Sequence, residues 1–207
     1  MNTLSIEAAF KFGWETFKKR PGFFIGMTAI IFAVSWATGF IIGLVGMKGN
    51  SVGGVINLLV TTLLDLGVVA TMLKVYDAPE SANFSDLWHP QQYLPYLGAT
   101  VLTAIIVVVG LVLLVVPGII AATMLLFVKF IVVDRKMAPI EALKESARMT
   151  KGHRMTLFLL VLAIAVLNIV GAILLVVPLL VTIPVSTLAM VYAYRKIGHA
   201  ASEVVAA

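Results

Sequence analysis

Asp65 is the ionisable residue that lies deepest within an apolar stretch of the sequence, about eleven residues from the end of that stretch at residue 76. An ionised side chain at the centre of a membrane helix costs about 2.5 to 3.5 kcal/mol, so Asp65 is expected either to be protonated or to have a polar partner. Asn168 lies at nearly the same depth in another apolar stretch and is the expected partner. Thr61 or Thr62, one helical turn from Asp65, could share the contact.

Asp65 has two possible roles. It could carry a proton or bind a cation in a small transporter, or it could link two helices by hydrogen bonding. The link is favoured because transporters normally gather several polar groups or broken helices at the midplane, and Pro184 with Thr182 offers only one further break. Lys129 lies roughly 9 Å shallower and is expected to extend to the membrane surface, with a salt bridge to Asp65 as the second choice.

The remaining residue types argue against an enzyme. All three histidines, His89, His153 and His199, lie outside the apolar stretches, so no pair can sandwich a haem within a membrane. No metal-ligand spacing, nucleophile motif or phosphate loop occurs, and the chain has no cysteine for a thiolate site. An intramembrane aspartyl protease would need two buried aspartates, and only Asp65 qualifies. We therefore expect no catalytic residue, no cofactor and no metal.

The elements that position Asp65 are predicted by composition. The 207 residues are 61% hydrophobic and 12% charged, with a mean hydropathy of +1.07, whereas soluble domains carry roughly 25% charged residues. The chain is therefore expected to be an all-α integral membrane protein. Two apolar stretches are too long for one span and are predicted to fold back, the first at Pro117-Gly118 and the second at Pro178. This gives six spans, over residues 22–46, 53–75, 96–116, 118–133, 156–177 and 179–194.

The distribution of Lys and Arg predicts the orientation of these spans. Of the 15 basic residues, Lys48 alone falls on one side of the predicted membrane, and the others fall on the side that carries both termini. We expect a multi-pass protein of the cell (inner) membrane with cytoplasmic N and C termini. The net charge of +5 is then explained by topology and lipid headgroups, so the expected partners include membrane lipids but no nucleic acid.

Internal similarity predicts three repeat units in one domain. A shift of 61 positions superimposes the segment around Pro117 on that around Pro178 and pairs Ser85 with Ser146, and a shift of 134 superimposes 6–8 on 140–142. The units cover residues 4–76, 84–133 and 139–196, and 197–207 form a short tail. Each unit is predicted to be a cytoplasmic interfacial amphipathic segment followed by a transmembrane hairpin.

The interfacial segments are predicted to carry apolar residues on one helical face and charged residues on the opposite face. In the first segment, Ile6, Phe10, Trp14 and Phe17 share one helical face. In the third, Ile140, Leu143 and Ala147 lie opposite the charged residues. The expected anchors at headgroup depth are Trp14, Trp88, Tyr93 and Tyr96.

Gly39, Gly43 and Gly46 are spaced by four and three residues in the first span, which lets another helix approach closely. Packing within the chain is the expected use of these glycines. Association with a second copy, or docking onto a larger membrane complex, stays open.

Three motifs in the C-terminal half carry a resemblance: residues 114–119 (LVVPGI), residues 132–134 (VVD), and residues 142–146 (ALKES) with 150–152 (TKG). They resemble uncharacterised bacterial multi-pass membrane families similar to the membrane domain of glycerophosphoryl diester phosphodiesterases. The resemblance implies a six-helix membrane domain and no established activity.

The sequence thus favours a non-enzymatic membrane protein, either a lipid-embedded scaffold or an accessory subunit of a membrane complex that contains other membrane subunits or further copies of itself. The alternative is a small permease that uses Asp65 as a proton or cation site.

Overall fold

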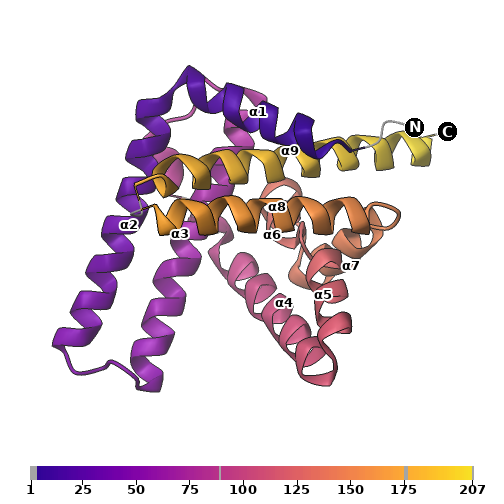
Figure 1. Ribbon diagram of the computed structural model, residues 1–207. Helices are drawn as coiled ribbons and strands as arrows, with labels where there is room; N and C mark the ends of the chain where they lie inside the picture. Colours follow the sequence, from indigo (N-terminus) through magenta and orange to yellow (C-terminus); the bar gives the residue numbers. More distant parts are fainter. Residues whose placement is uncertain (1–3, 89, 175–176, 207) are drawn as a thin grey trace.

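The computed structural model describes residues 4–88, 90–174 and 177–206, and this part of the chain is entirely helical apart from turns and loops (Figure 1). The all-α prediction is confirmed. The α-helices are α1 (Ile6–Lys19), α2 (Pro21–Leu44), α3 (Ser51–Asp77), α4 (Tyr93–Leu113), α5 (Val115–Met124), α6 (Val128–Arg135), α7 (Pro139–Met149), α8 (Arg154–Ile173) and α9 (Leu179–Ala206), with short 3₁₀ helices η1 (Phe84–Leu87) and η2 (Pro90–Gln92) before α4.

Five helical stretches of the described chain are long and apolar enough to cross a membrane: α2, α3, α4, α8 and Val115–Arg135, which comprises α5 and α6. Their bounds match the first three and the fifth predicted spans to within a few residues. The predicted sixth span, 179–194, lies in α9, which is not one of the five, and the expected tail continues this helix to Ala206.

The chain reverses direction between α4 and α5 at Leu114, whose backbone is extended, with φ −162° and ψ 144°. The turn was predicted at Pro117-Gly118, but Pro117 lies in the first turn of α5, where a helix needs no N–H donor. Gly118 contributes close packing instead, because a Cβ on Gly110 would lie 2.9 Å from the Gly118 Cα. At the second predicted turn, Pro178 directly precedes α9, and its carbonyl accepts hydrogen bonds from the first turn of that helix.

The predicted span over 118–133 is not one continuous helix, because α5 ends at Met124 and α6 begins at Val128. The hydroxyl of Ser146 in α7 replaces the backbone hydrogen bonds lost at this break. It donates to the Met124 carbonyl at 2.8 Å and accepts from the Phe127 N–H at 3.2 Å. Thr150 also donates to the Met124 carbonyl, at 3.3 Å. The break is thus stabilised by two residues of the motifs that carry the family resemblance.

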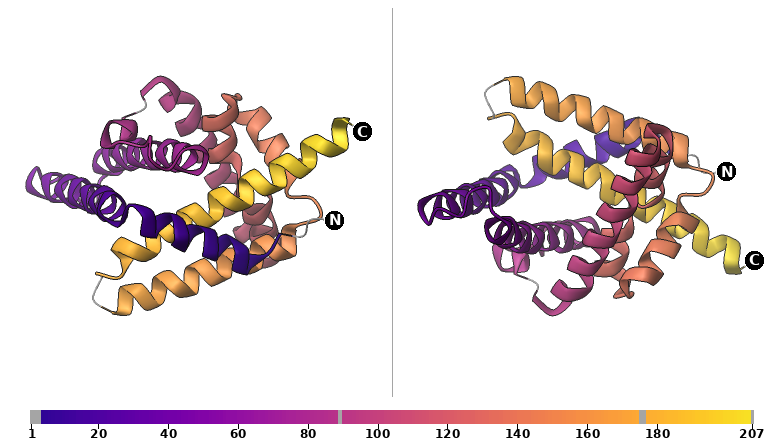
Figure 2. Two further views of the ribbon diagram at one scale, coloured as in Figure 1. Left: turned by 90° about the horizontal axis from the view of Figure 1, so that it is seen from above. Right: turned by 90° about the horizontal axis from the view of Figure 1, so that it is seen from below.

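Helix α1 lies along α9, which lies beside α8, and this layer runs across the direction of α2 and α3 (Figures 1 and 2). Gly13 permits the approach, because a Cβ there would lie 2.5 Å from the Val185 carbonyl oxygen of α9. The buried residues of α1 are Ala9, Gly13, Thr16 and Phe17. Of the predicted apolar face, Phe17 is buried and Ile6 and Phe10 pack partly buried against the core, so Trp14 is the residue that departs from the prediction. Trp14 is 47% exposed.

Helix α7 differs from its prediction in the same way. Its buried residues are Ala142, Ser146 and Met149, while Ile140, expected on the apolar face, is 62% exposed. Leu143, also expected on the apolar face, is partly buried against the core, so the prediction fails at Ile140 and not at Leu143. The buried face of α7 also carries Ser146, which reaches the α5–α6 break.

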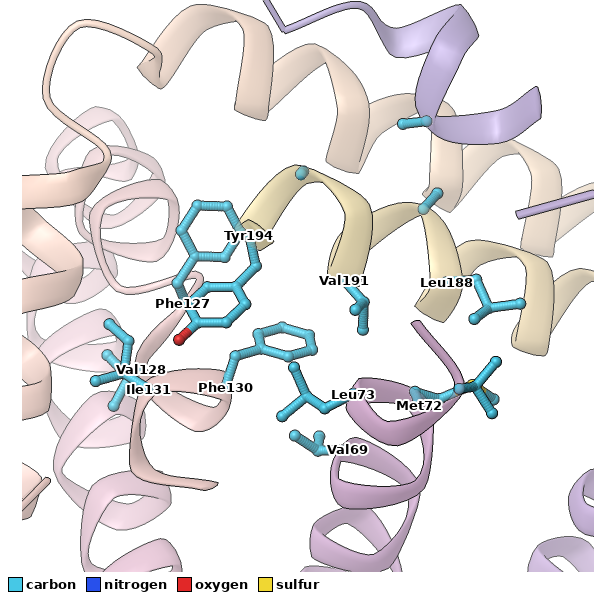
Figure 3. Close-up of a cluster of buried hydrophobic side chains, with 14 of the residues drawn as sticks. Val69, Met72, Leu73, Phe127, Val128, Phe130, Ile131, Leu188, Val191 and Tyr194 are labelled. Carbon is cyan, nitrogen blue, oxygen red and sulfur yellow. The ribbon is translucent and has the colours of Figure 1, made fainter. Parts of the chain in front are cut away.

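The hydrophobic core lies where α3, α6 and α9 meet (Figure 3). Met72 of α3, Phe127 and Ile131 at the start of α6, and Leu188 and Tyr194 of α9 are all at most 1% exposed. Away from this junction, α2 and α8 expose large apolar side chains along their length, as helices surrounded by lipid do.

Candidate functional site: the polar cluster at Asp65

Asp65 lies in α3 and forms an ion pair with Lys129 of α6. The hydroxyl of Tyr96 in α4 donates a 2.8 Å hydrogen bond to the same carboxylate oxygen, Oδ2. One oxygen therefore joins three helices. The prediction of Asn168 as the partner of Asp65 is wrong, and the second choice, Lys129, is correct.

The α5–α6 break explains why Lys129 reaches Asp65. The depth estimate assumed one straight helix through the predicted fourth span, with Lys129 rising towards the membrane surface at 1.5 Å per residue. Because the chain turns after Met124, Lys129 is instead the second residue of a separate short helix that packs on α3. The Lys129 ammonium forms an ion pair with Asp65 and does not extend to the membrane surface.

Tyr96 corrects a second expectation. It was predicted to be an interfacial anchor, but its side chain is completely buried and its hydroxyl serves Asp65. Tyr93, one turn earlier, donates to the Leu59 carbonyl at 2.9 Å and so links the start of α4 to α3. Of the other predicted anchors, Trp14 and Trp88 are exposed, as side chains at headgroup depth would be.

Asn168 of α8 bonds to α9 instead of α3. Its amide donates to the Ile164 carbonyl at 3.0 Å and to the Ser186 hydroxyl at 3.2 Å. Its Oδ1 atom is buried and has no hydrogen-bond partner among the described residues. Thr61 donates to the Asn57 carbonyl at 2.7 Å, and Thr62 is buried. Neither forms a hydrogen bond to Asp65 in the described structure.

Two cavities of about 270 Å³ each meet at Asp65. One is lined by Lys129, Asn168, Ser186 and Thr187, so the predicted pair does share a cavity although it forms no bond. The other is lined by Thr28, Ser35, Thr61 and Thr187. More polar groups therefore surround Asp65 than the sequence predicted. Ser186 and Thr187, polar residues just after Pro184 in an apolar stretch, were the available signal.

This arrangement suits charge compensation more than chemistry. Lys129 neutralises Asp65, and both hydrogen bonds to the carboxylate end on Oδ2, so Oδ1 remains available to a hydrogen-bond donor in either cavity. In the described part of the chain, no group of three or more His, Asp and Glu side chains could hold a metal ion.

Gly39 and Gly43 of α2 do not pack within the chain. A Cβ on Gly39 or Gly43 would meet no atom within 4 Å, so the expectation of intrachain packing is wrong. The close glycine contact near this end of α2 is instead local, since a Cβ on Gly53 in the first turn of α3 would collide with the Met47 carbonyl oxygen in the connecting loop. Gly46 has a different use: its φ of 71° lets the chain leave α2 in a left-handed conformation.

A second polar network, which was not predicted from the sequence, joins the C-terminal ends of α3 and α6 to α9. Arg195 of α9 donates to Asp77 at the end of α3 at 2.7 Å and to Asp134 of α6 at 3.0 Å. The Tyr194 hydroxyl also donates to Asp134, at 2.7 Å. Asp134 belongs to the second motif of the resemblance, whose residues therefore hold the packing of α6 against α9.

Comparisons with known proteins identify a family of unknown function. No curated protein and no solved structure matches the chain. A family described as "protein of unknown function (DUF975)" matches residues 91–201, which include the helices from α4 to α8 and most of α9. Because this match covers more than half of the 207 residues, the chain belongs to the DUF975 family.

Proposed function

We propose that the protein is a six-span membrane protein of the inner membrane with both termini in the cytoplasm. The sixth span would be the apolar part of α9, residues 179–194, which pairs with α8. The reversals at Leu114 and before Leu179 support hairpins, and each hairpin would follow one interfacial segment in the three units 4–76, 84–133 and 139–196. The resemblance to the membrane domain of glycerophosphoryl diester phosphodiesterases is part of this proposal.

Within that topology, we propose a non-enzymatic scaffold or accessory subunit. The observation that carries this proposal is the contrast between the two kinds of surface. The intramembrane charges of Asp65 and Lys129 compensate each other inside the chain, whereas α2 exposes apolar side chains beside the open faces of Gly39 and Gly43. A helix from another subunit could approach α2 closely there, since small residues allow backbones to pack without a void.

Cysteine crosslinking tests the scaffold proposal directly, because the chain has no cysteine of its own. Cysteine at Gly43 should form a crosslink in native membranes, either to a second copy or to a companion protein. Cysteine at Thr71 is the matched control, because this side chain of α3 is completely buried and cysteine is of similar size. A Gly43→Cys protein that gives no crosslink and is extracted gently as a monomer without companions would contradict the proposal.

A small permease is the second candidate, and the two cavities at Asp65 favour it. They place hydroxyl, amide, ammonium and carboxylate groups around one carboxylate oxygen that has no bond from the described residues. In proteoliposomes, Asp65→Asn should then abolish proton or cation flux while the protein stays folded, and Thr38→Val on the exposed side of α2 should leave flux unchanged. Flux that survives in Asp65→Asn would remove the permease candidate.

A further inference from the structure

A polar cleft of about 530 Å³ lies away from Asp65, between the end of α3, the segment before α4, the end of α6 and Arg195 of α9. Its charged lining consists of Lys74, Asp77, Asp134, Lys136 and Arg195, and Gln91 and Gln92 add amides. Its apolar lining is Ala70, Leu73 and Val133. The cleft thus combines mixed charges with an apolar wall, which is the chemistry of an amphiphile's polar end rather than of a free ion.

Four of these five charged residues already form ion pairs. Arg195 bonds to Asp77 and Asp134, and Lys74 donates to both oxygens of Asp86, at 2.9 and 2.8 Å. Lys136 is different, because no acid of the described residues lies within ion-pair distance of it. It is therefore the cation of the cleft that remains available for an external anion.

The backbone of Lys136 points to the same residue independently. Its φ of 52° is the only positive value at a non-glycine residue in the described chain. A left-handed conformation costs roughly 1 to 2 kcal/mol for a residue with a Cβ, and glycine is the usual choice at such a helix end. Lys136 therefore lines the cleft from a left-handed helix end.

Asp77 supplies the complementary charge. It is 57% exposed, and its one hydrogen bond, from Arg195, ends on Oδ2. No described group bonds Oδ1, so the cleft presents a carboxylate oxygen as well as an ammonium. A ligand that carries both a phosphate and a primary ammonium matches this pair, because the ammonium can donate to Asp77 while the phosphate accepts from Lys136.

We infer that the polar cleft binds the zwitterionic headgroup of a phospholipid that carries a primary ammonium, with the phosphate at Lys136 and the ammonium at Asp77. The glycerol end would lie against Ala70, Leu73 and Val133. The choice of a lipid over a soluble phosphate compound rests on the proposed topology, in which the ends of α3 and α6 lie at the cytoplasmic membrane surface.

The test is native mass spectrometry of the full-length protein, delipidated in detergent and titrated with phosphatidylethanolamine, phosphatidylcholine, phosphatidylglycerol or free phosphoethanolamine. Phosphatidylethanolamine should bind about tenfold more tightly than phosphatidylcholine, whose choline cannot donate a hydrogen bond. Phosphatidylglycerol, which has no ammonium, should also bind more weakly. Equal binding of the three lipids overturns the inference, and equal binding of free phosphoethanolamine overturns the assignment to a lipid.

Two variants locate the site. Lys136→Gly removes the ammonium and suits the left-handed backbone, so it should keep the fold and weaken phosphatidylethanolamine binding about tenfold. Asp77→Asn should abolish the preference for ethanolamine over choline, and Arg195 keeps its bond to Asp134 in that variant. Lys48→Gly is the matched control and should bind as the wild type does. Unchanged binding in both Lys136→Gly and Asp77→Asn contradicts the inference.

The outcome is separable from that of the proposed function. Lipid binding is measured in detergent and does not require a partner subunit or transport. Membrane topology is measured by labelling in cells, so an incorrect topology would be detected there even if the headgroup binds.

Discussion

The Lys129 ammonium donates to Oδ2 of Asp65, so an ion pair joins α6 to α3 across 64 residues of sequence. Each charge alone would be costly in apolar surroundings. Together they neutralise each other and, through Tyr96, hold α4 in the same junction. The polar cluster is therefore a structural link before it is a candidate for any transport.

The ion pair predicts strong coupling between Asp65→Asn and Lys129→Met. Each single variant leaves the other charge unpaired and should therefore be less stable in detergent. The free energy of unfolding should fall by about 2.5 to 3.5 kcal/mol if the full insertion cost applies. The double variant should lose much less than the sum of the two. Asp65→Asn with Lys48→Met is the matched control and should be additive, since Lys48 lies in the loop between α2 and α3, far along α3 from Asp65. Additivity for Asp65 and Lys129 would contradict the pairing.

Ser146→Ala tests the hydrogen bonds at the α5–α6 break. The substitution leaves the Phe127 N–H without its acceptor and takes a donor from the Met124 carbonyl, both in a buried site, so we expect a loss of about 1 to 3 kcal/mol in the free energy of unfolding. Ser85→Ala is the control, because Ser85 aligns with Ser146 in the internal repeat yet is exposed. Similar thermal stability of the two variants would show that the Ser146 hydroxyl does not stabilise the break.

Gly13→Ala tests the packing of α1 on α9. The new methyl group would collide with backbone of α9 at Val185, which cannot move aside as a flexible side chain can. We expect α1 to separate from α9, with a lower unfolding temperature and faster proteolysis near residue 20. Gly54→Ala in α3 meets no atom within 4 Å and should be neutral or stabilising, by up to about 1 kcal/mol. Equal behaviour of the two proteins would exclude a close contact.

Glu145, which lies outside the proposed spans, is expected to make the stability of the protein depend on pH. The hydrogen bond from Arg148 lowers the pKa of Glu145 below its usual value of about 4.3, and Arg135 adds to this effect. Since the folded pKa is the lower one, this stabilisation is complete above the unfolded pKa and is lost as the pH falls through the folded pKa. Between about pH 5 and pH 3, the wild type should lose more thermal stability than Glu145→Gln. Parallel pH profiles would contradict this contribution.

Apolar length and composition predict the helices well. Helices α2, α3, α4 and α8 match their predicted spans because a run of about 20 apolar residues has few alternatives to a spanning helix. The turns were less predictable. Pro117 indicated a reversal, but proline is tolerated in the first turn of a helix, so the reversal could occur three residues earlier at Leu114.

The polar cluster could be predicted only in part. Asp65 could be identified because an acid in an apolar stretch is rare. Its partner depends on the α5–α6 break, and residues 125–127 contain no proline or glycine that would predict a break there. The break is stabilised by Ser146 and Thr150 from α7, a contact distant in sequence. The buried faces of α1 and α7 also include small residues that an apolar periodicity does not single out, such as Gly13 and Ser146, because their contacts lie in helices distant in sequence.

The most direct test of the account is the labelling of single cysteines in spheroplasts with a membrane-impermeant maleimide. Cysteine at Lys48 should be labelled from outside, and cysteine at Ser81 or Lys151 should be labelled only after lysis. Labelling of Lys48→Cys and Ser81→Cys from the same side would contradict the hairpin of α2 and α3, and with it the placement of Asp65 and Lys129 inside the membrane.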